Sequence, residues 1–245
     1  MKLTVLGKYG PFPAPGGACS GYLLEADDVK LALDMGSGTL SRLFQRGGIA
    51  GLNAVILSHL HSDHYADLLI LRYALELLHG REKRIPVPLT VVGPGEPESI
   101  FRQLAAFGVY EMVASIDGMK FRFGSVSVTL HRMIHPVPSY AMDITDGRTR
   151  LFYTGDTGWS DRLADLCKYA DVLLADTGLL SSDKTTNAPH LTAREAGIIA
   201  RDAMVKRLIC THIWGGGYTD EMILKEASEA FPDAEVAEEL FAYNV

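Results

Sequence analysis

The chain has 245 residues, of which 47% are hydrophobic and 22% charged, and this balance excludes a disordered or fibrous protein because there is enough apolar side chain for one large core. The net charge of −7 disfavours sequence-independent binding along a phosphate backbone. A local basic groove is compatible with that charge, and its candidate side chains are Arg42, Arg46, Arg81, Lys83 and Arg84.

Cys19, Cys167 and Cys210 lie far apart in the sequence. An odd number of cysteines without paired spacing is typical of a reducing compartment. The N-terminal residues lack the pattern of a signal peptide, and no apolar run is long enough to span a bilayer. We therefore expect a soluble, cytoplasmic protein without a membrane partner.

The first half of the chain mixes short strands with helices. Apolar runs bounded by glycine, proline or aspartate predict strands, and leucines at helical spacing predict helices. The expected elements are a strand over 2–6, a loop over 10–17, a hairpin of strands 21–26 and 29–34, a helix over 41–46, a buried strand over 53–57, a loop over 58–64, a helix over 66–78, a strand over 89–92 and a helix over 98–107.

The second half again mixes short strands with helices. The helix predicted from residue 192 begins with Thr192 as N-cap and has Glu195 at the capping-box position. The expected elements are a strand over 126–133, a hairpin of strands 140–145 and 150–154, a helix over 160–169, a buried strand over 172–175, a helix over 192–204, a strand over 208–211, a helix over 220–231 and a strand over 235–242.

This order is not a strict alternation of strand and helix, so it argues against a doubly wound parallel sheet. Two mixed sheets packed face to face, with helices outside, fit the pattern better. We expect one domain over residues 1–245, built of two similar halves at roughly 1–125 and 126–245.

Four ligand-type side chains follow the buried strand at 53–57: His59, His61, Asp63 and His64. In extended backbone, residues two apart point the same way, so His59 and His61 can bind one ion. The chain then turns into a helix, which directs Asp63 and His64 toward a neighbouring ion. Buried histidines without partners are costly, and imidazole with carboxylate suits zinc, manganese or iron.

Further candidate ligands lie where predicted strands end: His135, Asp156 and His212. Loops held by a rigid sheet are the usual place for such side chains. His131 competes with His135, since the two share strand parity and spacing alone does not separate them. Pro136 marks position 135 as the end of the strand and favours His135.

The segment His-Leu-His-Ser-Asp-His at 59–64, with His135, Gly-Asp-Thr at 155–157 and Thr-His at 211–212, resembles the metallo-β-lactamase superfamily across essentially the whole chain. The resemblance implies a four-layer αββα sandwich, in the α+β class, with two metals at one edge. It implies that one metal takes His59, His61 and His135, that the other takes Asp63, His64 and His212, and that Asp156 bridges them.

Within the superfamily the chain resembles ribonuclease Z and its phosphodiesterase relatives. His190, in His-Leu-Thr before a helix, resembles the histidine that assists at the scissile phosphate, and His135–Ser139 is also similar to that branch. The chain departs from the branch in lacking a tRNA-gripping arm and in having Asp176 where a glutamate is frequent.

The mechanism implied is attack on phosphorus by a hydroxide that bridges two divalent ions, with Zn²⁺ expected and Mn²⁺ or Fe²⁺ as alternatives. Asp63 and His190 are the predicted catalytic residues, and His190 offsets charge and protonates the leaving oxygen. Asp34 is either a carboxylate that orients a ligand histidine or a turn residue before Gly36. Ser139 either contacts the phosphate or serves the turn beside Pro138.

Two further features stay open at this point. Trp159 and Trp214 stand beside the predicted ligand loops, as a pocket wall or as core. The polar segment 179–189 is either a lid that carries His190 or a plain solvated loop.

The expected substrate is a phosphodiester or nucleotide: an RNA 3′ end or a small or cyclic nucleotide. The alternative is a thioesterase or other carboxylic-ester or amide hydrolase on the same metals, and a non-enzymatic metal-binding scaffold is disfavoured because all seven ligands are present. The resemblance also implies a homodimer.

Overall fold

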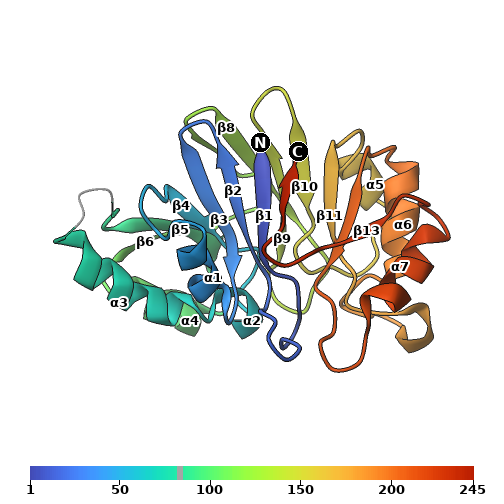
Figure 1. Ribbon diagram of the computed structural model, residues 1–245, viewed down its shortest axis with the longest axis horizontal. Helices are drawn as coiled ribbons and strands as arrows, with labels where there is room; N and C mark the ends of the chain where they lie inside the picture. The colour runs from blue at the N-terminus through green and yellow to red at the C-terminus, as the bar shows by residue number, and fades with distance from the viewer. Residues whose placement is uncertain (82–84) are drawn as a thin grey trace.

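The computed structural model describes residues 1–81 and 85–245, so the basic-groove candidates Lys83 and Arg84 lie outside the described residues. Two seven-stranded sheets pack face to face (Figure 1). The first has the spatial order β14 (Ala242–Asn244), β1 (Lys2–Gly7), β2 (Gly21–Ala26), β3 (Val29–Met35), β4 (Ala54–Ile56), β5 (Leu89–Pro94) and β6 (Tyr110–Ser115). The second has the order β13 (Glu235–Val236), β12 (Leu208–Thr211), β11 (Val172–Asp176), β10 (Arg150–Tyr153), β9 (Tyr140–Thr145), β8 (Val126–Arg132) and β7 (Lys120–Phe123).

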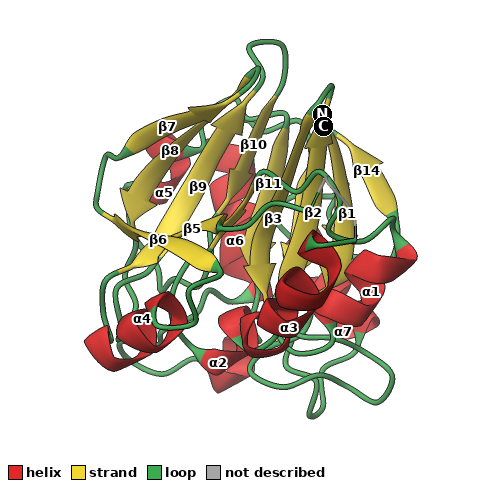
Figure 2. Cartoon of the chain, turned by 90° about the vertical axis from the view of Figure 1, so that its left-hand side faces the viewer, coloured by secondary structure: helices red, strands yellow, loops and turns green. Residues whose placement is uncertain are grey.

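Helices cover the outer faces of both sheets, as Figures 1 and 2 show, and this is the predicted αββα sandwich. The helices and the one short 3-10 turn are α1 (Thr39–Gln45), α2 (Ser62–Tyr65), α3 (Leu68–His79), α4 (Glu98–Ala105), α5 (Leu163–Leu166), η1 (Ser181–Asp183), α6 (Ala193–Asp202) and α7 (Asp220–Ser228). Three buried clusters hold the layers together. One lies between the sheets, one under α1, α3 and α4, and one under α5, α6 and α7.

Both sheets are mixed, and each has a run of parallel strands. In the first sheet β3, β4, β5 and β6 are parallel, and in the second β10, β11, β12 and β13 are parallel. The carboxyl ends of parallel strands lie at one edge of a sheet, so loops that follow these strands gather there. This topology is what brings residues far apart in the sequence to one site.

The predicted capping box at the start of α6 is confirmed: Thr192 Oγ1 accepts a hydrogen bond from Glu195 N, and Glu195 Oε2 accepts one from Thr192 N. Other boundaries were wrong. Only Leu163–Leu166 of the expected helix 160–169 is helical, and part of the expected loop 58–64 belongs to α2. Strands β6 and β7 were not predicted, because their partly exposed residues show no uninterrupted apolar run.

The expected single last strand over 235–242 was also wrong, because the region contributes to two strands in different sheets. Glu235–Val236 pairs with β12 in the second sheet, whereas Ala242–Asn244 pairs with β1 in the first. The chain crosses from the first sheet to the second between Ser115 and Lys120, because β7 already pairs with β8 in the second sheet. This crossing lies a few residues before the predicted division of the chain near residue 125. The last strand therefore returns to the sheet of the first half, and the two termini lie side by side (Figures 1 and 2). None of the described helices combines the length and apolar character that crossing a bilayer requires.

Candidate metal centre

The carboxyl ends of the parallel strands carry the polar side chains of the site. Asp34 lies at the end of β3, His59 follows β4, Asp156 follows β10 and His212 follows β12. Asp34 and His212 have φ values of 56° and 57°, in the left-handed region that non-glycine residues rarely adopt. Such backbone is retained where the surrounding structure holds it, and here it turns both side chains toward the same edge.

The segment 59–64 places its four polar side chains through a short change of backbone. His61 is the extended N-cap of α2, whose first turn contains Asp63 and His64. His59 and His64 are fully buried, and Asp63 is nearly so. The extended backbone before the helix and the helical turn after it therefore present two pairs of side chains in different directions, as the sequence predicts.

The first group of donor atoms joins His59, His61 and His135, which the resemblance assigns to one ion, with Asp156, which it assigns as the bridge between the two ions. His61 Nδ1 lies 3.0 Å from His59 Nε2 and 3.2 Å from His135 Nε2. Asp156 Oδ2 lies 3.5 Å from His59 Nε2. His131 is not part of this group and points instead toward Asp143 Oδ2, 3.8 Å away, so the structure brings together His135 and not its competitor.

The second group consists of Asp63, His64 and His212. Asp63 Oδ2 lies 3.4 Å from His64 Nε2 and 3.3 Å from His212 Nε2. Asp156 lies between the two groups: its Oδ2 is 3.2 Å from His212 Nε2, and its Oδ1 is 3.4 Å from His64 Nε2. All seven predicted ligands are thus brought into one connected cluster.

The donor set fits metal ions on two observations. Bonds of 2.0–2.1 Å at a tetrahedral ion place its ligands about 3.3 Å apart, and the donor separations above run from 3.0 to 3.5 Å. In addition, His64 Nε2 and Asp156 Oδ1 are buried and have no hydrogen-bond partner among the described residues. Buried polar atoms are normally paired, and a cation would satisfy both. These clusters are able to hold metal ions.

The electrostatics of the cluster favour neutral imidazoles beside an ionised carboxylate. Burial lowers the pKa of His59, His61 and His135, which keeps them in the neutral form that binds a metal. Burial would raise the pKa of the Asp156 carboxyl, but His212 and the other histidines outweigh it and lower that pKa.

His64 behaves differently because three carboxylates surround it. Burial opposes a charge on its imidazole, but Asp156, Asp63 and Asp34 outweigh burial and raise the pKa of His64. Positive charge is therefore stabilised at this point of the cluster, and the same field attracts a cation.

Two ring nitrogens that face away from the cluster, those of His64 and His135, have fixed partners. His64 Nδ1 donates to Asp34 Oδ2 at 2.9 Å, and Tyr153 Oη donates to the same oxygen at 2.7 Å. Ser58 donates to both oxygens of Asp34, through its N at 2.7 Å and its Oγ at 2.8 Å. His135 Nδ1 donates to the carbonyl of Pro189 at 3.1 Å. Such contacts set which nitrogen of a histidine faces a metal.

His190 lies at the rim of the cluster and is held by Asp176. Its Nδ1 donates to Asp176 Oδ2 at 3.0 Å and lies 3.9 Å from Asp156 Oδ2, while its ring stacks on that of His212 with centroids 4.9 Å apart. Burial alone would lower the pKa of His190, but Asp176 and then Asp156 outweigh it and raise that pKa to about 9. The contact with Asp176 therefore favours the protonated form of this imidazole.

The other residues singled out in the sequence make structural contacts within the chain. Ser139 is fully buried, and its Oγ donates to the Asp156 carbonyl at 2.9 Å, so it supports the turn and does not reach a substrate. Segment 179–189 is tied to α7 and α6 by Ser181–Glu226 and Lys184–Glu195 contacts. The basic-groove candidates Arg42 and Arg46 are engaged with chain carbonyls, those of Leu6 and Gly16 for Arg42 and that of Leu240 for Arg46.

Sequence reasoning missed the role of two residues of the site, one of which, Asp176, it noted only as a departure from the ribonuclease Z branch. Asp176 ends β11 at the same edge as Asp156 and His212, and that position was the available signal for its contact with His190. Gly10 belongs to a loop that lies over His212, where a Cβ would meet His212 Nε2 at 2.0 Å. Nothing in the glycine-rich composition of 10–17 distinguishes this glycine from its neighbours.

Two mixed sheets packed between helices, with histidine and aspartate clusters able to hold metal ions at one edge, are the architecture of the metallo-β-lactamase fold. A family model described as the beta-lactamase superfamily domain matches residues 34–213, and the chain belongs to this superfamily.

Relatives narrow the class to hydrolases. YhfI of Bacillus subtilis, a probable metallo-hydrolase, is 36% identical over 234 residues that cover 94% of each protein. Its crystal structure matches 99% of this chain and 98% of its own chain with a TM-score of 0.93 at 33% identity. Ribonuclease Z of Mycobacterium bovis is 30% identical and covers 100% of this chain and 98% of its own length. The short form of human tRNase Z, 21% identical with a TM-score of 0.77 over 100% of this chain and 99% of its own, shares the fold. The chain is a metallo-hydrolase of this superfamily.

Proposed function

We propose that this metallo-hydrolase is a phosphodiesterase that acts on a nucleotide phosphodiester. The observation that carries the proposal is His190, an imidazole hydrogen-bonded to Asp176 at the rim of the cluster. A phosphodiester carries a negative charge in its ground state and gains more at the reacting centre, whereas a thioester or carboxylic ester is neutral. A cationic side chain beside the cluster therefore favours the phosphodiester over the ester substrates.

The residues of the cluster form two sets of metal ligands. His59, His61 and His135 would hold one divalent ion, and Asp63, His64 and His212 would hold a second, with the Asp156 carboxylate placed between the two groups. We expect zinc, because neutral imidazole and carboxylate at tetrahedral spacing suit it, with Mn²⁺ or Fe²⁺ as alternatives. When bound, the ions supply Lewis acidity at the phosphate and water of lowered pKa.

The chain's own side chains bind, orient and move protons. The second ring nitrogen of His190 is free to donate to a phosphate oxygen or to protonate the leaving oxygen, because Nδ1 is occupied by Asp176. Asp34 fixes the ring of His64, and the Pro189 carbonyl fixes that of His135. Asp63 contributes a carboxylate between His64 and His212.

The substrate is expected to be an RNA 3′ end or a small or cyclic nucleotide. The relatives named ribonuclease Z support RNA. The net charge of −7 and the engagement of Arg42 and Arg46 with chain carbonyls favour a short substrate over a long phosphate backbone. Three buried, unpaired thiols support the cytoplasmic location expected from the sequence.

The test of the function is steady-state hydrolysis of bis(4-nitrophenyl) phosphate by the zinc-loaded protein, with a chelated sample and a thioester substrate alongside. We expect turnover of the phosphodiester that disappears on chelation and returns on adding zinc. Protein shown to hold two ions that cleaves the thioester and leaves the phosphodiester intact would overturn the proposal.

Replacing Gly10 by alanine should reduce metal content without unfolding the protein. The new Cβ would lie 2.0 Å from His212 Nε2, so the imidazole must turn away and the second ion loses a ligand. Metal content measured by atomic emission is expected to fall from two ions toward one. Gly80→Ala, where nothing lies within 4 Å of the new Cβ, is the matched control. Full occupancy in Gly10→Ala would contradict the prediction.

We further infer that the protein forms a homodimer through the outer face of α3. Ile70, Tyr73 and Leu77 follow the i, i+3, i+7 spacing of one helix face, and all three are exposed. The exposed Phe44 of α1 lines the same pocket as Ile70. Clustered apolar side chains on a surface mark an interaction site, and a second copy presents a matching patch.

The dimer is tested by light scattering of Ile70→Glu. We expect the mass to fall from twice 26.7 kDa to 26.7 kDa, because a buried carboxylate without a partner is incompatible with an apolar interface. Leu224→Glu, on an exposed position of α7, should leave the mass unchanged. A wild-type protein that is monomeric at high concentration would disprove the dimer.

A further inference from the structure

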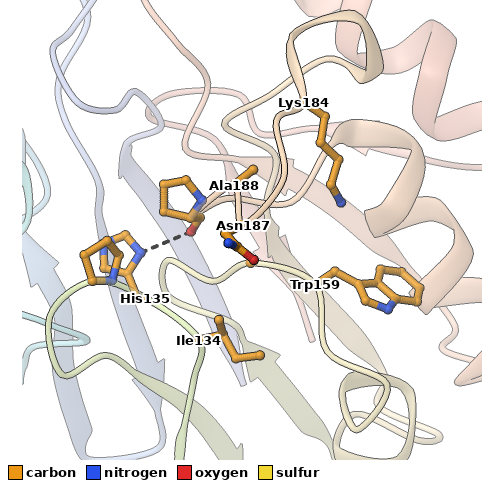
Figure 3. A pocket seen from close by; sticks show the side chains of 9 residues that line it. Ile134, His135, Trp159, Lys184, Asn187 and Ala188 are labelled. Atoms are coloured by element: carbon orange, nitrogen blue, oxygen red, sulfur yellow. Dashed lines mark hydrogen bonds between the residues drawn. The ribbon is translucent and has the colours of Figure 1, made fainter.

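A pocket of about 480 Å³ opens beside His135. His135 is both a wall of this pocket and a member of the first donor group, so whatever occupies the pocket lies next to the cluster. Small-molecule sites have volumes of about 300–1,000 Å³, and this pocket is in that range. Figure 3 shows His135 on one side and Trp159 on the other.

The walls of the pocket expose two large apolar side chains. Trp159 is 38% exposed and Ile134 is 56% exposed, although both could contribute more to stability if buried. Trp159 Nε1 donates to Asp161 Oδ1 at 2.9 Å, which fixes the plane of the indole. An exposed aromatic ring held by such a contact is a platform on which nucleobases stack.

The floor of the pocket is made of backbone in close contact. Gly158 N donates to the Ile134 carbonyl at 2.7 Å, and a Cβ at Gly158 would lie 2.6 Å from the Ala188 carbonyl. Glycine is therefore required for the approach of the Ala188 loop. The wall that carries Ile134 and the loop that carries Asn187 are held at a fixed separation.

Besides His135, the polar side chains that line this pocket are those of Lys184, whose Nζ is paired with Glu195, and Asn187. The amide of Asn187 is exposed, makes no hydrogen bond to any other described residue, and lies between His135 and Trp159 in Figure 3. An amide presents a donor and an acceptor side by side, which matches the N6–H and N7 edge of adenine. Guanine presents two acceptors, O6 and N7, at the same edge.

We propose that this pocket is an adenine-binding subsite in which Trp159 stacks on the base and the Asn187 amide pairs with its N6–N7 edge. The proposal rests on the proposed function, because the base belongs to the nucleotide whose phosphate reaches the cluster. It extends that function by naming the residues that select the substrate.

A second pocket, of about 420 Å³, lies against His190 and His212 and contains Trp214, Tyr218 and Asp183. Its polar group at the rim is the Asp183 carboxylate, which already accepts from Tyr218 Oη. A carboxylate offers acceptors alone and places negative charge beside an anionic substrate. The Trp159 pocket is therefore the better match to a base edge with one donor and one acceptor.

The chain has two tryptophans, one in each pocket, so intrinsic fluorescence reports on the pockets separately. Zinc-loaded Trp214→Phe, with Trp159 as its fluorophore, should be quenched by AMP and not by ribose 5-phosphate. Zinc-loaded Trp159→Phe should respond to neither. A response to AMP from Trp214 alone, or equal affinity for AMP and ribose 5-phosphate, would overturn the proposal.

Calorimetric affinities then test each contact. Trp159→Ala should weaken AMP binding at least about fivefold, the low end of what one base–aromatic stack contributes, while Trp214→Ala binds AMP like the wild type. Asn187 has φ of 63°, which glycine tolerates, so Asn187→Gly removes the amide without backbone strain. It should abolish the preference for AMP over GMP, and an unchanged preference would contradict the assignment of the amide.

The two proposals fail in different ways. If the protein cleaves an aryl phosphodiester but binds AMP without a change in Trp159 fluorescence and with equal affinity in Trp159→Ala, the phosphodiesterase is sustained and the adenine subsite is overturned. Quenching of Trp159 by AMP in a protein that cleaves no phosphodiester would overturn the phosphodiesterase and sustain the subsite.

Discussion

Replacing Asp156 by asparagine is expected to leave one metal ion or fewer per chain and to cut phosphodiester turnover by about 10²-fold or more. The Asp156 carboxylate lies within 3.5 Å of nitrogens from both groups: His59 on one side, His64 and His212 on the other. Asparagine keeps the size but removes the negative charge and turns one oxygen into a donor that cannot bind a cation. Metal content and turnover are measured on the same sample.

Asp233→Asn makes the same chemical change at an exposed position and should behave as the wild type. Circular dichroism of both variants separates loss of metal from loss of fold. Two bound ions with wild-type turnover in Asp156→Asn would show that this carboxylate does not link the metals.

Replacing His190 by asparagine is expected to lower kcat for the phosphodiester by about 10²–10³-fold while the metal content stays at the wild-type level. His190 is close enough to Asp156 and His212 to form a third possible donor group, but its Nδ1 is bound to Asp176 and it is not one of the seven proposed ligands. Its loss is therefore expected to remove the cation and proton donor and no ligand of either ion. Asp176→Asn should give a smaller loss, because the imidazole remains but loses the carboxylate that orients it.

His79→Asn is the matched control, since His79 lies at the end of α3 and its Nδ1 contacts the Ile85 carbonyl. A fall in metal content in His190→Asn equal to its fall in kcat would assign His190 to the ligands. Unchanged kcat would remove the main support for phosphodiester chemistry over ester chemistry.

How much of the site the sequence predicts depends on local context. His59, His61, Asp63 and His64 could be grouped because ligand-type residues crowd directly after a buried strand. Asp176 could not, since a single carboxylate at a strand end is equally typical of a turn, and its contact with His190 depends on the parallel pairing of β11 and β12. The role of Gly10 depends on a loop approaching His212 from more than two hundred positions earlier in the chain.

The fold shows the same division between local and long-range information. Buried strands such as β4 and β11 and the capped helix α6 could be located because apolar runs and capping residues act over a few positions. The region 235–242 could not be divided, because its apolar residues do not say which sheet each one joins. That choice is made by partners in β12 and β1.

The return of β14 to the first sheet affects how the chain reaches its native state during synthesis. Until residues 242–244 emerge from the ribosome, β1 is the open edge of its sheet, with unpaired backbone groups. The first half can bury its own helices early, but its sheet cannot be completed in advance of the second half. The edge of the first sheet is therefore expected to be completed only when β14 has docked, and a chain that lacks residues 242–244 would expose an edge that invites pairing with other chains.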